Sequence, residues 1–392
     1  MPQKTDVIVL GGGIVGASTA YALVNKGKSV RLVDQYQAGH KRGSSHGDGR
    51  VVRFNYTEAI YVEMAMHAYK AWDDLSSRVG DPLIKRTGLL EYGPVGDESI
   101  QLSERILQDY DIPYEPLSVE QARERFPQYA FPDEGEIIYQ PDGAVALATS
   151  AVKALWQLFE ADGGILQPNT RITQIDIGDT VTLTTASGET LEADSLVITA
   201  GGWAIKLAQQ TGLTLPLDVT QEILAYFPPK EDATANHHVG TMPVMLDNFK
   251  LPDSDAPFYC LPMIDVQGVK MGWHHSGVAM DADEERRIVP EIVAELKNWQ
   301  ARRFPQLQNE PIQVDTCLYT NTPDYHFVLD RHPAHNNVVI GAGFSGHGFK
   351  FGPLLGEILA SLLIGEASPV NLETFSIARF QDEASLEKRV GA

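Results

Sequence analysis

Residues 6–34 contain the feature that most limits what this chain can fold into. The continuous apolar run DVIVL suits a buried parallel strand, and the glycine-rich turn GGGIVG and the helical stretch ASTAYALVNK follow it. Gly11, Gly13 and Gly16 satisfy the pattern G-x-G-x-x-G, and a second apolar strand ends at Asp34. In this context glycines let the backbone approach a pyrophosphate at a helix N-terminus, and the acid binds ribose hydroxyls. The segment predicts a dinucleotide-binding α/β fold, the alternative being a glycine-rich turn with a structural role only.

Local patterns predict further elements in the middle of the chain. Residues 38–49 form a polar, Gly- and Ser-rich loop, and an amphipathic helix follows. Its apolar positions at helical spacing are Tyr61, Met64, Ala65, Ala68, Trp72 and Leu75. The stretch RTGLLEYG (86–93) is typical of a strand entering a different sheet. Residues 139–159 are predicted to pass from a turn into an amphipathic helix, and 163–202 to form a strand meander that ends in a buried strand.

The last third of the chain returns to the nucleotide-binding pattern. Residues from about 216 to 315 are predicted to be mostly strands, with one acidic helix near 283–304. The stretch GAGFSGHGFKFGPLLGEILASLL (341–363) then reads as a strand end, a glycine loop and an apolar helix. The first glycine motif does not separate NAD from FAD, but this second loop favours FAD. Its N–H groups and positive helix end suit the negative pyrimidine edge of a reduced flavin. The alternative is a tightly packed strand-to-helix turn.

These patterns predict a combination of α/β and mixed β structure. A Rossmann-like, discontinuous FAD-binding domain would hold an inserted substrate domain, built on a large mixed or antiparallel sheet with helices. The expected limits are 1–85, 146–215 and 316–392 for the FAD-binding domain, and 86–145 and 216–315 for the substrate domain.

Charge and cysteine content restrict the partners that the chain is expected to have. With 31 basic and 52 acidic residues the net charge is −21, which argues against nucleic acid or an anionic membrane as a partner. It leaves an anionic small substrate open, because a few arginines can set the potential of one cleft. The chain has two cysteines, strand-like DVIVL begins at Asp6, no apolar run is long enough for a membrane span, and the terminal RVGA matches no targeting motif. A cytoplasmic protein, a monomer or weak dimer, is the expectation.

Seven stretches, in the same order along the chain, resemble the monomeric sarcosine oxidase and N-methyltryptophan oxidase family, within the D-amino-acid oxidase superfamily of flavoenzymes. They are DVIVLGGGIVG, GSSHGDGRVVRFNY, PDGAV, ITAGGWA, GVKMGWHH, TCLYTNTPDYHFVLDRHP and GFSGHGFKF. Together they extend from near the start to about residue 355. The set is specific, whereas the first stretch alone is not.

The resemblance implies FAD, attached through a cysteine sulfur to the 8α-methyl group of the flavin ring. The matching cysteine is Cys317 within TCLYT, and a thiolate is a suitable nucleophile for such a bond. From the residues alone a buried filler is the commoner role of a free cysteine. Cys260 matches no functional position and keeps that interpretation. The implied cofactor-binding residues are Gly11, Gly13, Ile14, Val15, Gly16, Asp34, Gln35, Arg42, Ser44, Ser45, His46, Arg50, Ile172, Ala200, Gly201, Trp203, Cys317, Gly346, His347, Gly348 and Lys350.

The resemblance also implies a set of catalytic and substrate-binding residues. Arg53, aided by Lys350, would bind the substrate carboxylate, since a guanidinium binds carboxylate in a bidentate fork. Lys270 would lie over the reactive face of the flavin and activate dioxygen, because a fixed cation stabilises superoxide-like charge. Without the resemblance, the simplest interpretation of Arg53 and Lys270 is that their charged side chains are exposed to solvent. The complete implied set is Lys270, Arg50, Arg53, His274, Tyr259, Tyr319 and Lys350, and no metal is implied.

The predicted function is oxidation of a secondary amino acid, such as sarcosine or another N-methyl amino acid. An imine would form and be hydrolysed to amine and aldehyde, and dioxygen would be reduced to hydrogen peroxide. Gly49 replaces a threonine, Ser45 replaces a histidine and residues 243–258 contain an insertion relative to sarcosine oxidases, so a bulkier or cyclic substrate stays open (pipecolate, N-methyltryptophan or a glycated amino acid). The sequence is also compatible with a dehydrogenase that passes electrons to a partner protein, and with a flavin-binding protein without catalysis.

Overall fold

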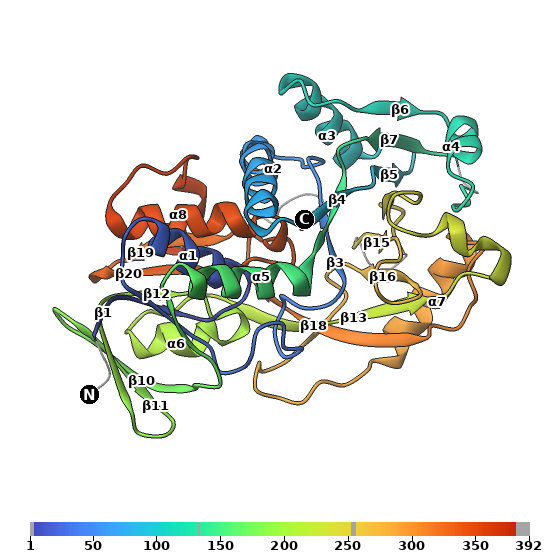
Figure 1. The fold of residues 1–392 in the computed structure, drawn as a ribbon. Helices are drawn as coiled ribbons and strands as arrows, with labels where there is room; N and C mark the ends of the chain where they lie inside the picture. Colours follow the sequence, from blue (N-terminus) through green and yellow to red (C-terminus); the bar gives the residue numbers. More distant parts are fainter. Residues whose placement is uncertain (1–3, 132–133, 252–255, 382–392) are drawn as a thin grey trace.

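The computed structural model describes residues 4–131, 134–251 and 256–381. The C-terminal RVGA and the end of the predicted FAD-binding domain therefore lie outside the described residues. Within these ranges the chain forms three sheets, with helices packed against them (Figure 1). The helices are α1 (Ile14–Asn25), α2 (Ala59–Val79), α3 (Glu98–Asp109), α4 (Val119–Arg125), α5 (Ala148–Ala161), α6 (Ala204–Gln210), α7 (Pro290–Arg303) and α8 (Gly352–Ile364).

The first sheet is built from three separate stretches of the chain. Its main order, among the described residues, is β10 (Ile172–Ile177), β11 (Val181–Thr185), β12 (Thr190–Ile198), β1 (Thr5–Leu10), β2 (Val30–Val33) and β9 (Ile165–Gln167). Two further strands, β19 (Val328–His332) and β20 (His335–Ala342), extend it, with β20 paired in parallel to β12. Strands β1, β2, β9, β12 and β20 pair in parallel, and β10 and β11 form an antiparallel extension. This is the discontinuous α/β arrangement that the glycine motifs predict.

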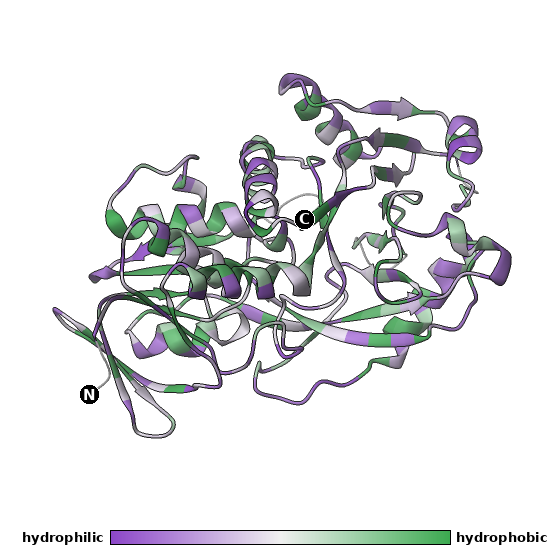
Figure 2. Cartoon of the chain, in the orientation of Figure 1, coloured by the Kyte–Doolittle hydropathy of each residue, from purple (hydrophilic) through white to green (hydrophobic). Residues whose placement is uncertain are grey.

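Helices cover both faces of this sheet, because its central strands are apolar on both sides. Helices α1, α5 and α8 lie on one face, and α6 packs on the other (Figure 1). Hydrophobic residues concentrate along α8 and the strands beside it, whereas β10 and β11 alternate in polarity (Figure 2). Helices α1 and α8 approach closely at Gly356, where a Cβ atom would lie 2.4 Å from the backbone of Ser18.

The second sheet forms the other half of the molecule. Its order is β17 (Val278–Ala279), β13 (Asp218–Phe227), β16 (Val269–Trp273), β15 (Phe258–Leu261), β14 (Val244–Asp247), β5 (Leu89–Gly93), β7 (Glu136–Gln140) and β6 (Glu115–Leu117), and β18 (Gln313–Asn321) pairs with β13. Helix α7 packs on this sheet through Arg303, whose Nε donates a 2.6 Å hydrogen bond to the buried carboxylate of Asp247. The strand predicted at 86–93 does enter a different sheet from β1. The predicted domain limits stay a prediction, and β18 extends across the limit at 316.

Two predicted elements differ from the structure. Residues 144–147, expected to lead from a turn into a helix, form strand β8 (Ala144–Leu147) of a small sheet with β3 (Gly49–Val52) and β4 (Ile84–Arg86). The pairing partners lie far away in the sequence, so the local pattern did not reveal this strand. The helix expected near 283–304 begins at Pro290, because proline has no N–H to donate and suits the first helical position.

Candidate functional site

The glycine turn between β1 and α1 has no room for side chains. Gly11 has a φ of +103°, and a Cβ atom on it would lie 2.6 Å from the carbonyl oxygen of Thr199. A Cβ atom on Gly16 would lie 1.8 Å from the carbonyl oxygen of Gly11. The two glycines therefore bring the start of α1 against the end of β12, the close backbone approach that a pyrophosphate site at a helix N-terminus requires.

Asp34 lies at the end of β2, beside this turn. Its carboxylate accepts a 2.6 Å hydrogen bond from the Gly12 N–H and a 2.8 Å hydrogen bond from the Tyr36 N–H. Burial raises the pKa of Asp34, although both of these hydrogen bonds lower it. The side chain is thus fixed at the edge of a cavity, as a ribose-binding acid requires.

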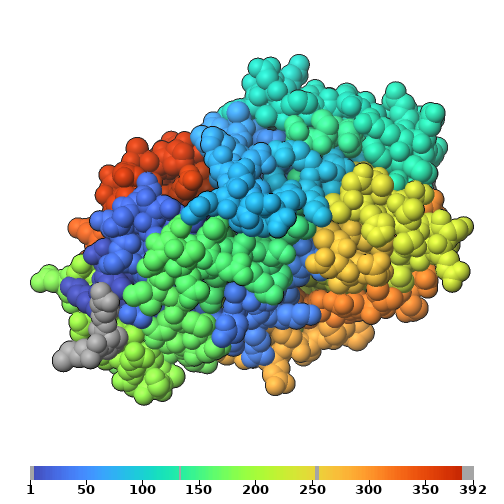
Figure 3. Space-filling model, viewed as in Figure 1, coloured from blue at the N-terminus to red at the C-terminus, as the bar shows by residue number. Residues whose placement is uncertain are grey.

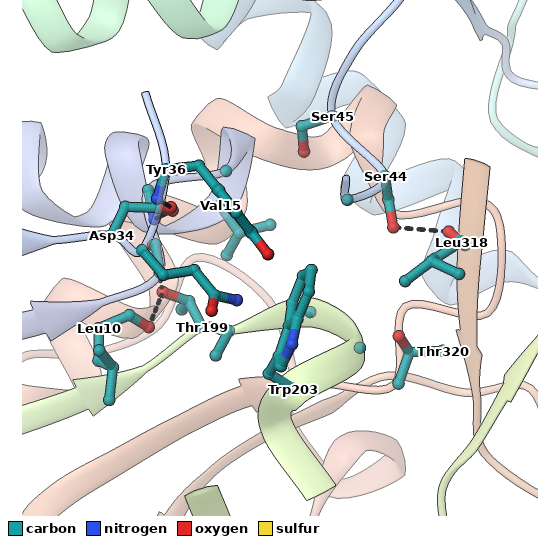
Figure 4. A pocket seen from close by; sticks show the side chains of 18 of the residues that line it. Leu10, Val15, Asp34, Tyr36, Ser44, Ser45, Thr199, Trp203, Leu318 and Thr320 are labelled. Carbon is teal, nitrogen blue, oxygen red and sulfur yellow. Dashed lines mark hydrogen bonds between the residues drawn. The ribbon is translucent and has the colours of Figure 1, made fainter. Parts of the chain in front are cut away.

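A cavity of about 370 Å³ extends from Asp34 to strand β18. Figure 4 shows its wall, with Asp34 and Tyr36 at one side, Trp203 projecting into the space, and a hydrogen bond from Ser44 Oγ to the Leu318 carbonyl at the other. Most of the predicted cofactor-binding residues line this cavity: Gly11, Gly13, Ile14, Val15, Asp34, Gln35, Ser44, Ser45, Arg50, Ile172, Ala200, Gly201, Trp203, Cys317, Gly346 and Gly348.

The other predicted cofactor residues have different positions. Gly16 lies inside the turn, and Arg42 is half-buried with its carbonyl accepting a hydrogen bond from Arg286. His46 is buried, and neither of its ring nitrogens has a hydrogen-bond partner among the described residues. Burial, and then the positive charges of Arg50 and Lys270, lower the pKa of His46 to about 3. It is therefore a neutral imidazole with unused hydrogen-bonding capacity.

A second cavity of about 100 Å³ adjoins the first. All the predicted catalytic residues line it: Lys270, Arg50, Arg53, His274, Tyr259, Tyr319 and Lys350. His347 also lines it. The residues common to both cavities are Arg50, Cys317, Tyr319, Gly346 and Phe349. Because these residues border both spaces, they mark where a group bound in one cavity would meet a molecule bound in the other.

Cys317 is one of these shared residues, and it is 4% exposed. Burial raises the pKa of its thiol, and the nearby Arg50 guanidinium opposes that rise. Cys317 lies directly opposite Glu222 of β13, so the two side chains share one face of the sheet. Cys260, in contrast, is buried in the core of the second sheet, where its sulfur is 3.7 Å from the Tyr129 hydroxyl.

Lys270 projects from β16 and is 2% exposed. Its Nζ donates a 2.8 Å hydrogen bond to the carbonyl oxygen of Gly49. Burial lowers the pKa of Lys270 well below its ordinary value, and the Arg50 guanidinium lowers it further. A negative charge in the cavity would therefore favour the protonated form of this lysine.

The predicted carboxylate-binding residues meet at a tyrosine that sequence reasoning missed. The Arg53 guanidinium lies 4.7 Å from the ring centroid of Tyr56, and Lys350 Nζ donates a 2.8 Å hydrogen bond to the Tyr56 hydroxyl. The same hydroxyl is 3.3 Å from His347 Nδ1. Tyr56 thus orients donors from two distant segments. The only feature of the local sequence that could have indicated this role is its spacing of three residues from Arg53.

A second pair in this cavity consists of His274 and Tyr319. His274 Nδ1 lies 3.0 Å from the Tyr319 hydroxyl, and the two rings meet edge to face. Burial raises the pKa of Tyr319 and of Tyr259. Both phenols therefore stay protonated at neutral pH and can donate hydrogen bonds to a ligand. Of the insertion predicted at 243–258, residues 252–255 lie outside the described residues.

Sequence reasoning also missed a polar group in the second cavity, formed by Asn55, Glu91 and Asn248. No local pattern could have identified these three residues, because they come from separate segments. Within the described ranges, no group of His, Cys, Asp or Glu side chains is arranged to hold a metal ion. In the same ranges, no helix combines the length and the hydrophobicity that crossing a membrane requires.

The geometry fits FAD. The turn at Gly11 can bind a pyrophosphate, Asp34 is fixed for a ribose, and Arg50 and Cys317 line the far end of the first cavity, where it meets the second cavity. A flavin ring at that end would adjoin the second cavity. The residues that would hold the flavin end include Cys317 and the Gly346–Gly348 loop.

Comparisons with known proteins agree with this geometry. The profile of the family described as FAD dependent oxidoreductase matches residues 6–362. Peroxisomal sarcosine oxidase of Homo sapiens is 35% identical over 384 residues, covering 96% of each chain. Monomeric sarcosine oxidase of a Bacillus species (strain B-0618) is 31% identical over 394 residues, covering 99% of each chain. The fold is similar to an amino acid oxidase essential for nikkomycin biosynthesis, with a TM-score of 0.84, 24% identity, and coverage of 95% of this chain and 97% of that one. The predicted fold class and family resemblance are confirmed.

Proposed function

This chain belongs to the FAD-dependent oxidoreductase family, and from that premise we propose that it oxidises a secondary amino acid. FAD would occupy the first cavity and the amino acid the second. The observation that carries the proposal is the shared border of the two cavities, at Arg50, Cys317, Tyr319, Gly346 and Phe349. A substrate in the second cavity would contact a flavin in the first there, and the named relatives are sarcosine oxidases.

The residues of the second cavity have separate roles in this proposal. Arg53 and Lys350 bind the substrate carboxylate and so fix the N-alkyl carbon toward the shared border. His274 and Tyr319 complete the wall beside the reacting carbon. When bound, FAD would supply the redox chemistry: it would accept two electrons and a proton from the N-alkyl carbon, and loss of the N–H proton would leave the imine. Dioxygen would take up the two electrons and two protons to give hydrogen peroxide. Lys270 provides the positive charge for the oxygen step.

We further propose that Cys317 attaches the flavin covalently. The thiol is buried at the shared border, within reach of both cavities, and the Arg50 guanidinium favours its thiolate. Protein precipitated with acid is expected to stay yellow, whereas Cys317→Ser protein should release its flavin into the supernatant. Cys260→Ser is the matched control and should behave as the wild type. A colourless wild-type pellet would contradict the attachment.

The experiment that tests the function is a peroxide-coupled screen of the purified protein. Sarcosine and other N-methyl amino acids are expected to give hydrogen peroxide in air and to bleach the flavin without air. Pipecolate, proline, N-methyltryptophan and glycated amino acids belong in the same screen, because the second cavity differs from that of the resembling family at Gly49. Flavin bleaching that needs an added electron acceptor for turnover would favour a dehydrogenase. No bleaching by any amine would contradict the proposal.

The cellular setting belongs to the same proposal. A reducing cytoplasm suits a protein whose two cysteines are buried and form no disulfide, and a monomer or weak dimer suits its small-molecule substrate. Sedimentation over a range of protein concentrations would test the oligomeric state, and a tight dimer at the lowest concentration would contradict a monomer or weak dimer.

A further inference from the structure

The second cavity contains a buried carboxylate that the proposed reaction does not use. Glu91 of β5 is 3% exposed and lines this cavity. Its Oε2 accepts a 2.9 Å hydrogen bond from Asn55 Nδ2, and its Oε1 accepts a 3.1 Å hydrogen bond from Asn248 Nδ2. Each carboxylate oxygen therefore receives one amide donor and keeps further lone pairs.

Two other buried acids in the described ranges are neutralised by arginines, whereas Glu91 is not. Asp247 pairs with Arg303, and Asp324 pairs with Arg379. Within residues 4–131, 134–251 and 256–381, Glu91 forms no ion pair with a basic side chain. A buried, unpaired carboxylate is costly, and that cost falls when a bound ligand brings a cation to it.

Asn55 indicates the same kind of ligand. Its side chain is fully buried, its Nδ2 is used by Glu91, and its Oδ1 has no hydrogen-bond partner among the described residues. The cavity thus presents the free acceptors of Glu91 and Asn55 side by side. Ammonium and guanidinium groups match such a surface, because they carry several N–H donors and no acceptor. A hydroxyl or amide would bring an acceptor of its own.

The same cavity also contains donors that carry no acceptor. Arg53 and Lys350 lie around Tyr56, on the segment after β3 and in the turn before α8. Glu91 lies on β5 of the second sheet, and Asn248 directly follows β14. A molecule that satisfies both groups has a carboxylate and a separate cation. Resting on the proposed function, we propose that the substrate is a secondary amino acid with an ammonium or guanidinium group on its side chain. Glu91, held by Asn55 and Asn248, binds that group.

The first test compares substrates that differ only in this group. Nα-methyl-lysine and Nα-methyl-arginine are compared with their neutral counterparts Nα-methyl-norleucine and Nα-methyl-citrulline as substrates of the flavin-containing enzyme. The value of kcat/KM is expected to be at least about 10-fold higher for the cationic pair, the usual effect of a charged hydrogen bond. Equal values, or a preference for the neutral or a glycated amino acid, would overturn the proposal, and this comparison needs no variant.

The second test assigns the preference to Glu91. Glu91→Gln keeps the shape and removes the charge, so the ratio of cationic to neutral kcat/KM should fall toward one. Glu98→Gln is the matched control, because Glu98 is an exposed residue of α3 whose loss changes the net charge equally. A cationic preference that survives in Glu91→Gln would remove Glu91 from the role.

The third test separates this inference from the proposed function. Binding of 6-aminohexanoate and of hexanoate is measured from the change that each causes in the flavin absorption spectrum, without turnover. The amino compound should bind wild type at least about 10-fold more tightly and lose that advantage in Glu91→Gln. If this holds while no amino acid reduces the flavin, the proposed function fails and the cation site stands. If sarcosine is oxidised but 6-aminohexanoate and hexanoate bind equally tightly, the cation site is contradicted and the proposed function stands.

Discussion

Arg53 is the residue with the simplest measurable role. Its guanidinium stacks on Tyr56 at the wall of the second cavity, and no carboxylate pairs with it among the described side chains. Arg53→Ala is expected to weaken the binding of simple carboxylate inhibitors by about 1.5–3 kcal/mol, the usual value of a charged hydrogen bond. Spectral titration of the bound flavin measures this change. Arg86→Ala, which removes an exposed partner of Asp73, is the control, and equal inhibitor affinity in both variants would exclude Arg53 from carboxylate binding.

Lys270 is expected to affect reoxidation of the flavin by dioxygen more than reduction of the flavin by substrate. A unit charge about 4 Å from developing negative charge contributes roughly 4 kcal/mol at an effective dielectric of about 20. Lys270→Met should therefore slow reoxidation of the reduced flavin by about a thousandfold. Stopped-flow measurement of reduction without air and of reoxidation with air separates the two steps. Comparable losses in both steps would indicate that Lys270 positions the substrate instead.

Glu222 gives a prediction about stability and pH. Burial raises the pKa of its carboxyl to about 7, above the value of about 4.3 in an unfolded chain. Between these values the folded protein retains a proton that the unfolded chain has lost. The free energy of unfolding should therefore fall as pH rises from about 4.5 through 7, by up to about 3 kcal/mol. Glu222→Gln should remove this part of the pH dependence of the melting temperature, whereas Glu98→Gln should keep it. Identical pH profiles for all three proteins would contradict the prediction.

At the level of elements, the contact between α1 and α8 sets the shape of the flavin-binding half. Alanine is ordinarily about 1 kcal/mol better than glycine inside a helix. At Gly356, however, a Cβ atom would lie 2.4 Å from Ser18, so Gly356→Ala must push the helices apart at a cost of about 1–3 kcal/mol. Thermal unfolding should show a net loss of stability. Gly178→Ala is the control, since the nearest atom to its Cβ would be 3.7 Å away, and an unchanged or raised melting temperature for Gly356→Ala would contradict the close contact.

Elements defined by local pattern could be predicted from the sequence, and those defined by pairing could not. The strand-turn-helix at 6–34 and the loop before α8 have short, periodic patterns, and the structure has both. The polar group around Glu91 depends on two long-range hydrogen bonds. Asn55 lies 36 positions from Glu91 in the sequence, and Asn248 lies 157 positions from it. The opposition of Cys317 and Glu222 depends on the register of β13 and β18. Such neighbours follow from tertiary packing, so only the family resemblance could indicate part of the second cavity.

At the level of the whole molecule, the flavin site joins both ends of the chain. The first cavity is lined by residues from Leu10 to Phe349, and the early and late segments of the chain lie together in the space-filling view (Figure 3). A bound flavin would therefore contact segments that are distant in the sequence and lie together only in the folded chain. A ligand that binds only the folded state raises the free energy of unfolding by RT ln(1 + [L]/Kd).

This linkage gives a test of the covalent bond that does not depend on activity. In wild-type protein the flavin would be part of the chain, so its melting temperature should not change when free FAD is added. Cys317→Ser protein, which would bind FAD reversibly, should melt at rising temperature as FAD increases, gaining about 2.7 kcal/mol at 100 times its Kd. Cys260→Ser again serves as the control, because that thiol lies in the core of the second sheet. If wild type and Cys317→Ser respond to FAD equally, the flavin is not tethered through Cys317, and the cavity holds it by its glycine turn and Asp34 alone.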